Sequence, residues 1–208
     1  PGWMDMSTLA YGTAGEYLTT QQTTVSCDPL TYSGWYNSVQ SYIWLGEHRK
    51  AIEIGREGLE TTSHNLVRRG LIYAYISDGE FDQAEIMIDR GSLNVQDAAY
   101  LRARIAAAMG DATKTKTLIN DYIGTGFAEA DDLLVMRAIA GDRDQANELA
   151  AEIDARPYGF LSLMSVPSEC FCGAPFDLTF TPNFAKLLEE ADLPWPPASP
   201  IGWPLKDW

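Results

Sequence analysis

Histidine and basic residues are scarce in this chain of 208 residues. It has two histidines, and its 15 lysines and arginines face 29 acidic residues, so the formal net charge is −14. Proteins bind nucleic-acid backbones and anionic lipids through clustered Lys and Arg, which displace counterions from the phosphates. The charge balance therefore argues against nucleic-acid binding by this chain.

Long apolar runs are also absent. No stretch approaches the roughly 18 to 20 apolar residues that cross a bilayer, and the first residues lack the basic start and apolar segment of a signal peptide. We therefore predict no membrane insertion by this segment. Because the chain begins with Pro rather than Met, we expect a processed piece of a longer protein, and the compartment, cytoplasmic or periplasmic, stays open.

Cysteine is rare, with only Cys27, Cys170 and Cys172 in the chain. Three cysteines are too few for a disulfide framework. Tetrahedral zinc needs about four ligands, and neither histidine is close to Cys170 and Cys172 in the sequence. The sequence thus favours a thiol pair or a single disulfide there, and predicts no metal site and no cofactor.

What the chain does contain is a regular series of Gly-acid pairs. They are Gly15-Glu16, Gly46-Glu47, Gly79-Glu80, Gly110-Asp111 and Gly141-Asp142, and they recur every 31 to 33 residues. Self-similarity with such a period indicates stacked repeats. Glycine adopts the left-handed conformation that ends many helices, and an acidic residue suits the positive start of the next helix. Each pair is therefore predicted to end one helix and begin another.

The residues around these pairs have helical spacing. Apolar residues at Leu71, Ile72, Tyr75 and Ile76 precede Gly79, and their spacing places them on one helix face. Phe81, Ala84 and Ile88 continue in the same way after the turn. The pattern predicts an all-α fold in which helical hairpins follow one another through about residue 155.

This organisation resembles the tetratricopeptide repeat family. The residues that match its pattern are Trp35, Tyr42, Gly46, Ala51 and Leu59 in one unit and Leu71, Ile72, Tyr75, Gly79, Phe81 and Ala84 in the next. Arg68 and Thr115 depart from it, since the family usually has a large apolar and a small residue there. The likeness covers roughly residues 3 to 155. It implies an α-solenoid of about five hairpins over residues 1–156.

The resemblance also implies a binding groove, because the first helix of each unit lines the inner surface in this family. The residues at the groove positions are Tyr36, Gln40, Trp44, Arg69, Tyr73, Tyr100 and Arg104. Aromatics and arginine are enriched in binding hot spots, and the arginines would suit a protein or extended peptide that carries acidic groups. Alternatively, the arginines pair with neighbouring acids and the tyrosines pack between helices. Assembly with further copies of the chain also stays open.

Residues 157–208 depart from the repeat. A short helix is predicted near residues 182–191, because Thr181 is a good cap and Pro182 suits the first helical position. Residues 193–208 are rich in Pro and Trp, which favours an extended course with large aromatics to bury. We expect this tail to pack on the array as part of the same folded unit and to cover the end of the last repeat; alternatively, it is a recognition peptide for another protein. The segment also resembles the end of the repeat region in some bacterial membrane-anchored regulators and cyclase-like signalling proteins, through its Cys-x-Cys-Gly-Ala-Pro-Phe-Asp, Thr-Pro-Asn-Phe and Pro-Trp-Pro-Pro motifs.

Sequence motifs for catalysis are missing. No Gly-x-Ser-x-Gly, His-Glu-x-x-His, Walker-type or Gly-x-Gly-x-x-Gly pattern occurs, and the repeat register places His48 and His64 in a turn and a link. The leading hypothesis is a non-catalytic scaffold that binds a protein or peptide in the groove. A second is a regulatory module of a larger signalling protein whose tail occupies that groove. A third, a hydrolase, would need an unrecognised serine such as Ser162, Ser165 or Ser168.

Overall fold

The computed structural model describes residues 14–126, 128–170 and 174–197. Over these ranges the chain forms eleven α-helices and one short 3-10 helix, and it contains no strand, which confirms the all-α prediction. The helices are α2 (Ala14–Cys27), α3 (Tyr32–Trp44), α4 (His48–Thr62), α5 (Asn65–Ser77), α6 (Phe81–Arg90), α7 (Val95–Ala108), α8 (Ala112–Gly124), α9 (Ala130–Ile139), α10 (Arg143–Asp154), α11 (Gly159–Cys170), the 3-10 helix η1 (Leu178–Phe180) and α12 (Pro182–Glu190).

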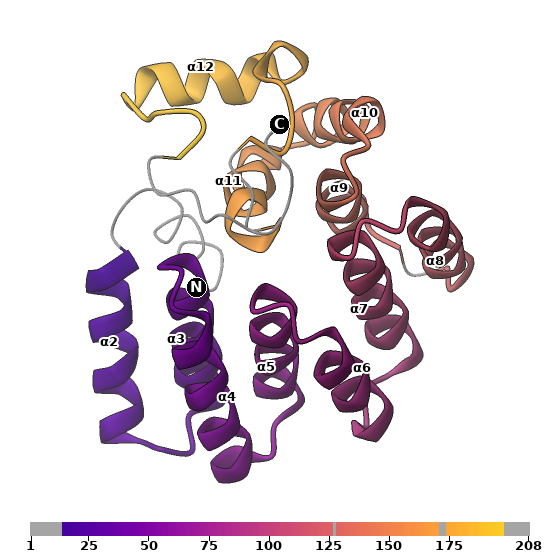
Figure 1. Ribbon diagram of the computed structural model, residues 1–208. Helices are drawn as coiled ribbons and strands as arrows, with labels where there is room; N and C mark the ends of the chain where they lie inside the picture. The colour runs from indigo at the N-terminus through magenta and orange to yellow at the C-terminus, as the bar shows by residue number, and fades with distance from the viewer. Residues whose placement is uncertain (1–13, 127, 171–173, 198–208) are drawn as a thin grey trace.

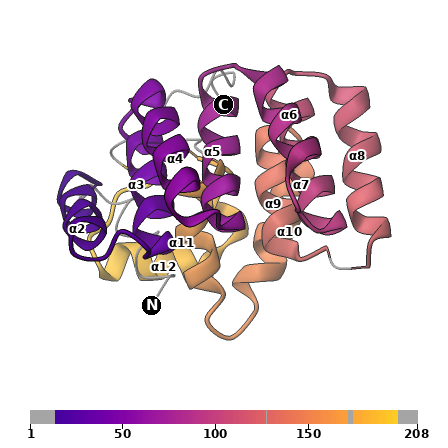
Figure 2. The ribbon, with the colours of Figure 1, turned by 90° about the horizontal axis from the view of Figure 1, so that it is seen from below.

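The helices form two layers of a solenoid-like array. Helices α3, α5, α7, α9 and α11 pack on one another in that order and form the inner layer, while α2, α4, α6, α8 and α10 pack on their sequence neighbours outside them. Figure 1 shows the array curving from α2 through α6 and α8 to α10, with α11 on the inner side of the curve and α12 beyond α10 and α11. Figure 2 shows the inner helices α3, α5 and α7 beside the outer helices α4, α6 and α8. The inner face of the curve is thus built from equivalent helices of successive hairpins.

Four of the five predicted glycine turns have the expected geometry. Gly46, Gly79, Gly110 and Gly141 have φ of 76°, 78°, 73° and 73°. In the second of these turns the Glu80 N–H donates to the Tyr75 carbonyl five residues earlier at 2.8 Å, and the other three turns make the equivalent bond. These bonds satisfy carbonyls that the helix end would leave unpaired. The acid that follows each glycine is the N-cap residue of the next helix.

The prediction of a fifth such turn at Gly15 is wrong. Gly15 is the second residue of α2, and its φ is not in the left-handed region. Glycine is compatible with either conformation, so spacing alone could not distinguish a helix end from a helix start. The fifth left-handed glycine in the described ranges is instead Gly126, in the link between α8 and α9, with φ of 75°.

Replacement of Gly79 by Ala is expected to lower the free energy of unfolding by about 1 kcal/mol. A Cβ there would have no heavy atom within 4 Å, so the cost arises from the left-handed backbone alone. Gly124→Ala is the matched control, because Gly124 also has open space around it but lies at the end of α8 without positive φ. Urea unfolding should show that the free energy of unfolding changes with opposite sign, or by clearly different amounts, in the two variants. Equal losses of stability would mean that the left-handed backbone at Gly79 is not the source of the cost.

The C-terminal part of the described chain closes the array. Helix α11, which was not predicted, packs on α9 and α10 and continues the inner layer, although Pro167 lies inside it. Helix α12 follows η1 and begins at Pro182. The Trp195 ring lies 4.9 Å from that of Phe176 and 5.4 Å from that of Phe184, measured between centroids. The described start of the tail therefore packs beside α12, and residues 198–208 lie outside the described ranges.

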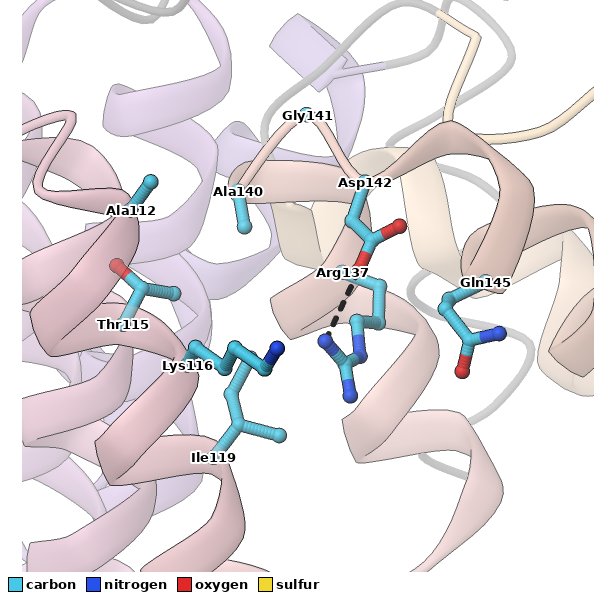
Figure 3. A pocket seen from close by; sticks show the side chains of 9 residues that line it. All are labelled: Ala112, Thr115, Lys116, Ile119, Arg137, Ala140, Gly141, Asp142 and Gln145. Atoms are coloured by element: carbon cyan, nitrogen blue, oxygen red, sulfur yellow. Dashed lines mark hydrogen bonds and ion pairs between the residues drawn. The ribbon is translucent and has the colours of Figure 1, made fainter.

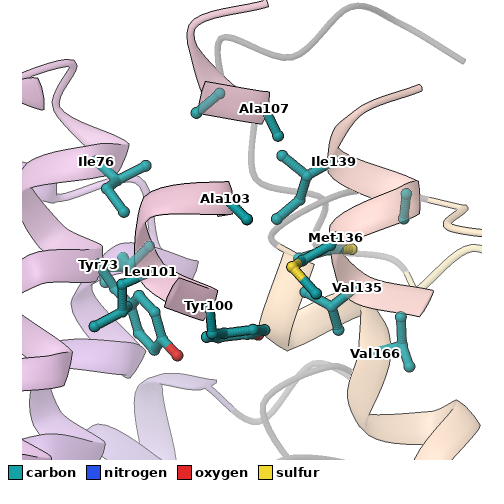
Figure 4. Close-up of a cluster of buried hydrophobic side chains, with 14 of the residues drawn as sticks. Tyr73, Ile76, Tyr100, Leu101, Ala103, Ala107, Val135, Met136, Ile139 and Val166 are labelled. Atoms are coloured by element: carbon teal, nitrogen blue, oxygen red, sulfur yellow. The ribbon is translucent and has the colours of Figure 1, made fainter. Parts of the chain in front are cut away.

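The hydrophobic core runs between the inner helices. Figure 4 shows Tyr73 and Ile76 of α5, Ala103 of α7, Ile139 of α9 and Val166 of α11 meeting in one cluster. All five are buried. Small residues such as Ala103 let neighbouring helices approach closely, so that large residues on α5 and α9 fill the space between them. Among the helices described, none is long and apolar enough to cross a membrane.

Candidate binding surface

The array brings four of the predicted groove residues into one cluster on the inner layer. Helix α5 supplies Arg69 and Tyr73, and α7 supplies Tyr100 and Arg104; within each pair the residues are four positions apart and share a helix face. The Arg104 Cζ lies 4.4 Å from the ring centroid of Tyr73 and 5.6 Å from that of Tyr100. The Arg69 Cζ lies 5.6 and 5.4 Å from the same two centroids. Both guanidinium groups therefore lie within cation–π distance of both rings.

Hydrogen bonds fix the four side chains in this arrangement. Arg69 Nε donates to the Tyr73 hydroxyl at 2.5 Å, and Arg104 Nη1 donates to the Tyr100 hydroxyl at 3.0 Å. Arg104 is 1% exposed, whereas the Arg69 side chain is 30% exposed. Burial raises the pKa of Tyr100 well above its ordinary value, so its hydroxyl stays protonated and accepts from Arg104 as a neutral group.

A residue that the sequence analysis did not single out, Glu169, completes the cluster from α11. Its backbone carbonyl accepts a hydrogen bond from Arg104 Nη2. Its carboxylate oxygen Oε1 lies 3.1 Å from the hydroxyl of Ser165, one helical turn earlier. Burial raises the pKa of Glu169, while the positive charges of Arg69 and Arg104 oppose the rise. The two arginines thus face an acidic residue of the chain itself.

The charge of the arginines is largely balanced inside the protein. Arg69 also makes an ion pair with Asp97 at 4.0 Å, so two cations face the carboxyl groups of Asp97 and Glu169. Arg104 and Tyr100 are buried beside α11 rather than displayed on an open surface. At this end of the predicted strip, the alternative in which arginines pair with acids and tyrosines pack between helices describes the contacts well.

The other end of the predicted strip, on α3, differs because two of its buried polar atoms have no hydrogen-bond partner in the described ranges. Tyr36, Gln40 and Trp44 are four residues apart on one face, and Gln40 Nε2 donates to the Tyr36 hydroxyl at 2.8 Å. Tyr36 is half-buried, and burial with the neighbouring Tyr73 raises its pKa to about 12. Gln40 and Trp44 are 1% and 2% exposed, yet Gln40 Oε1 and Trp44 Nε1 have no hydrogen-bond partner in the described ranges. One buried acceptor and one buried donor therefore lie on the same face of α3.

The histidines and serines considered for catalysis have structural roles where the structure describes them. His64 Nδ1 accepts from the Leu66 N–H as the cap of α5, and its ring stacks on Tyr32 with 3.7 Å between centroids. His48 begins α4, and partial burial lowers its pKa. The Ser165 hydroxyl donates to the Ser162 carbonyl at 2.8 Å. The side chain of Ser168 is not among those that the structure describes. None of these contacts joins a serine to a histidine.

The metal-ligand and cysteine predictions fall partly outside the described ranges. Within these ranges no group of three or more His, Cys, Asp or Glu side chains is arranged to hold a metal ion. Cys27 is a free, exposed thiol at the end of α2, and Cys170 is buried in a disulfide. Cys172 lies outside the described residues.

Comparison with known proteins does not assign the chain to a family. No protein-family model matches the chain, and no curated protein matches it significantly.

Proposed function

We propose that this chain is a non-catalytic, tetratricopeptide-like scaffold that binds an extended segment of a partner protein along the inner face of α3 and α5. The observation that carries the proposal is the pair of buried polar atoms without partners on α3, Gln40 Oε1 and Trp44 Nε1. Buried polar groups are nearly always hydrogen-bonded, and an unpaired one costs about 1 to 3 kcal/mol. A ligand that paired both atoms would recover that cost.

An extended peptide backbone offers the right groups for these two atoms. It presents N–H donors and C=O acceptors along its length. Because Gln40 and Trp44 are almost fully buried, the side chains that cover them must move aside before an N–H binds Gln40 Oε1 and a C=O accepts from Trp44 Nε1. Tyr36, which is partly buried, and the partly exposed Arg69 adjoin this face and supply apolar and polar contact area. Because Asp97 and Glu169 already face the arginines, we propose recognition of the backbone rather than of acidic side chains.

Selection of a displayed library of random 12-residue peptides on the intact chain tests this function. The affinity of a selected peptide is then measured for the wild type and for Gln40→Met and Trp44→Phe, which remove the polar atoms but keep most of the volume. Each variant should bind about 3- to 10-fold more weakly, as loss of one hydrogen bond predicts. The free energy of unfolding of Trp44→Phe should stay the same or rise, because a buried polar group without a partner has been removed. Gln40→Met also removes the 2.8 Å bond from Gln40 Nε2 to the Tyr36 hydroxyl, so its free energy of unfolding should fall by about 1 kcal/mol.

Trp35→Phe is the matched control. Trp35 is also on α3 and is buried, but its Nε1 already donates to the Pro29 carbonyl at 2.8 Å. This substitution should therefore cost about 1 kcal/mol of stability and leave peptide affinity unchanged. Failure to select any peptide, or equal affinity for the wild type, Gln40→Met and Trp44→Phe, would count against the proposal.

A further inference from the structure

The outer layer of the array has a gap between α8 and the α9–α10 hairpin. Helices α2, α4, α6 and α10 each pack on the inner helix that follows them, whereas α8 packs on α7 and makes no comparable contact with α9. The result is a pocket of about 500 Å³, which Figure 3 shows between α8 and the Gly141 turn. Small-molecule and side-chain sites in proteins commonly have volumes of about 300 to 1,000 Å³. The gap is therefore large enough to hold a ligand.

Two cations and one carboxylate line this pocket. Figure 3 shows Lys116 of α8 and Arg137 of α9 reaching toward one another across it. Arg137 Nη1 pairs with Asp142 Oδ2 at 2.9 Å, and the Arg137 side chain is only 17% exposed. Lys116 makes no ion pair with any carboxylate in the described ranges. In a chain of net charge −14, this pocket therefore has one positive charge in excess.

The remaining lining is largely apolar or small. Ile119 and Ala112 of α8 and Ala140 at the end of α9 line the pocket together with Thr115, Gly141 and Gln145. Ile119 is fully buried, so the accessible apolar surface of the pocket comes from Ala112 and Ala140. This surface favours a ligand with a short aliphatic part, because burial of apolar area is worth about 25 cal/mol per Å². The Arg137 guanidinium uses one nitrogen for Asp142 and has further donors in a planar fork that matches a carboxylate.

We infer that this pocket binds a carboxylate attached to a small aliphatic group, held between Lys116 and Arg137. An inorganic anion would satisfy the charges but has no aliphatic part to cover the accessible apolar surface of Ala112 and Ala140. The same chemistry occurs in a free short-chain carboxylic acid and at the C-terminus of a peptide that ends in Leu. This site lies on the outer layer and is independent of the inner face of α3 and α5.

Titration of the isotope-labelled full chain at low salt, followed by amide chemical shifts, tests the inference. The probes are 4-methylpentanoate, the peptide acetyl-Ala-Ala-Leu with a free carboxylate, the same peptide as its C-terminal amide, and inorganic phosphate. The amides of Lys116, Ile119 and Gly141 should shift and saturate with at least one carboxylate and not with the amide probe. Tenfold tighter binding of the peptide would identify a peptide terminus as the ligand, and equal or tighter binding of the free acid would identify a small acid.

Variants of α8 give the matched comparison. Lys116→Gln should weaken carboxylate binding about tenfold, as loss of a charge-assisted contact predicts. Lys114→Gln removes the same charge from an exposed position of α8 that does not line the pocket, and should leave the affinity unchanged. Four results would overturn the inference: no saturable shift with either carboxylate, equal binding of the amide, equal binding of inorganic phosphate, or equal weakening by both variants.

Discussion

Replacement of Arg104 by Ala is expected to lower the free energy of unfolding by about 3 kcal/mol. The side chain is almost fully buried, its guanidinium lies between the Tyr73 and Tyr100 rings, and its Nη2 holds the Glu169 carbonyl of α11. The substitution removes these contacts together and leaves the Tyr100 hydroxyl and the Glu169 carbonyl without this donor. Urea unfolding measures the loss.

The part of the structure that is destabilised by Arg104→Ala is as informative as the total loss of stability. Because Arg104 joins α7 to α11, amide hydrogen exchange in α11 should accelerate more than exchange in α4, which lies on the outer layer away from this contact. Arg104→Lys keeps the charge but lacks the planar fork, so it should recover only part of the stability.

Arg102→Ala is the control for the loss of an arginine from α7. Arg102 is on the same helix, but its side chain is 37% exposed and forms surface ion pairs with Glu85 and Asp89. Such pairs contribute about 0 to 1 kcal/mol, so the loss should be well below that of Arg104→Ala. If the two variants were equally stable, Arg104 would not be the link between α7 and α11.

The repeat was predictable from the sequence because its signals are local. A left-handed glycine and the acid that follows it set each turn within a few residues, and the apolar spacing of Leu71 and Tyr75 belongs to one helix. The resemblance to tetratricopeptide repeats implied that Arg69, Tyr73, Tyr100 and Arg104 lie on one strip, and the structure places both guanidinium groups within cation–π distance of the Tyr73 and Tyr100 rings. Gly15 shows the limit, since the same dipeptide lies within α2, where the glycine is not left-handed and no turn is made.

The contacts of α11 could not be predicted in this way. Pro167 inside the helix removes a backbone donor and usually disfavours a helix, so the local sequence gives little indication of α11. The bond from Arg104 to Glu169 joins residues 65 positions apart. It depends on α11 packing against α9 and α10, which no local pattern encodes. Four residues of the predicted strip, Arg69, Tyr73, Tyr100 and Arg104, lie together, and the sequence did not indicate that Glu169 contacts them.

The second large effect is expected at Asp154, the last residue of α10. Its carboxylate accepts from the backbone N–H of Asn183 at 3.0 Å and of Phe184 at 2.8 Å, so it caps the start of α12 from a different helix. Asp154 is 7% exposed. A buried carboxylate that accepts two backbone N–H groups at a helix start combines charge-assisted hydrogen bonds with the helix dipole. Asp154→Ala should therefore cost about 3 kcal/mol.

The expected consequence is local detachment of α12 before global unfolding. Amide exchange at Asn183 and Phe184 should rise sharply in Asp154→Ala, because both N–H groups lose their acceptor. Asp154→Asn retains one acceptor oxygen and should lose about half as much stability. Glu148→Ala, an exposed acid on the same helix, should change stability by less than about 0.5 kcal/mol. Unchanged exchange at Phe184 in Asp154→Ala would mean that the packing of Phe184 against Phe176 and Trp195, and not the carboxylate, holds α12 on the array.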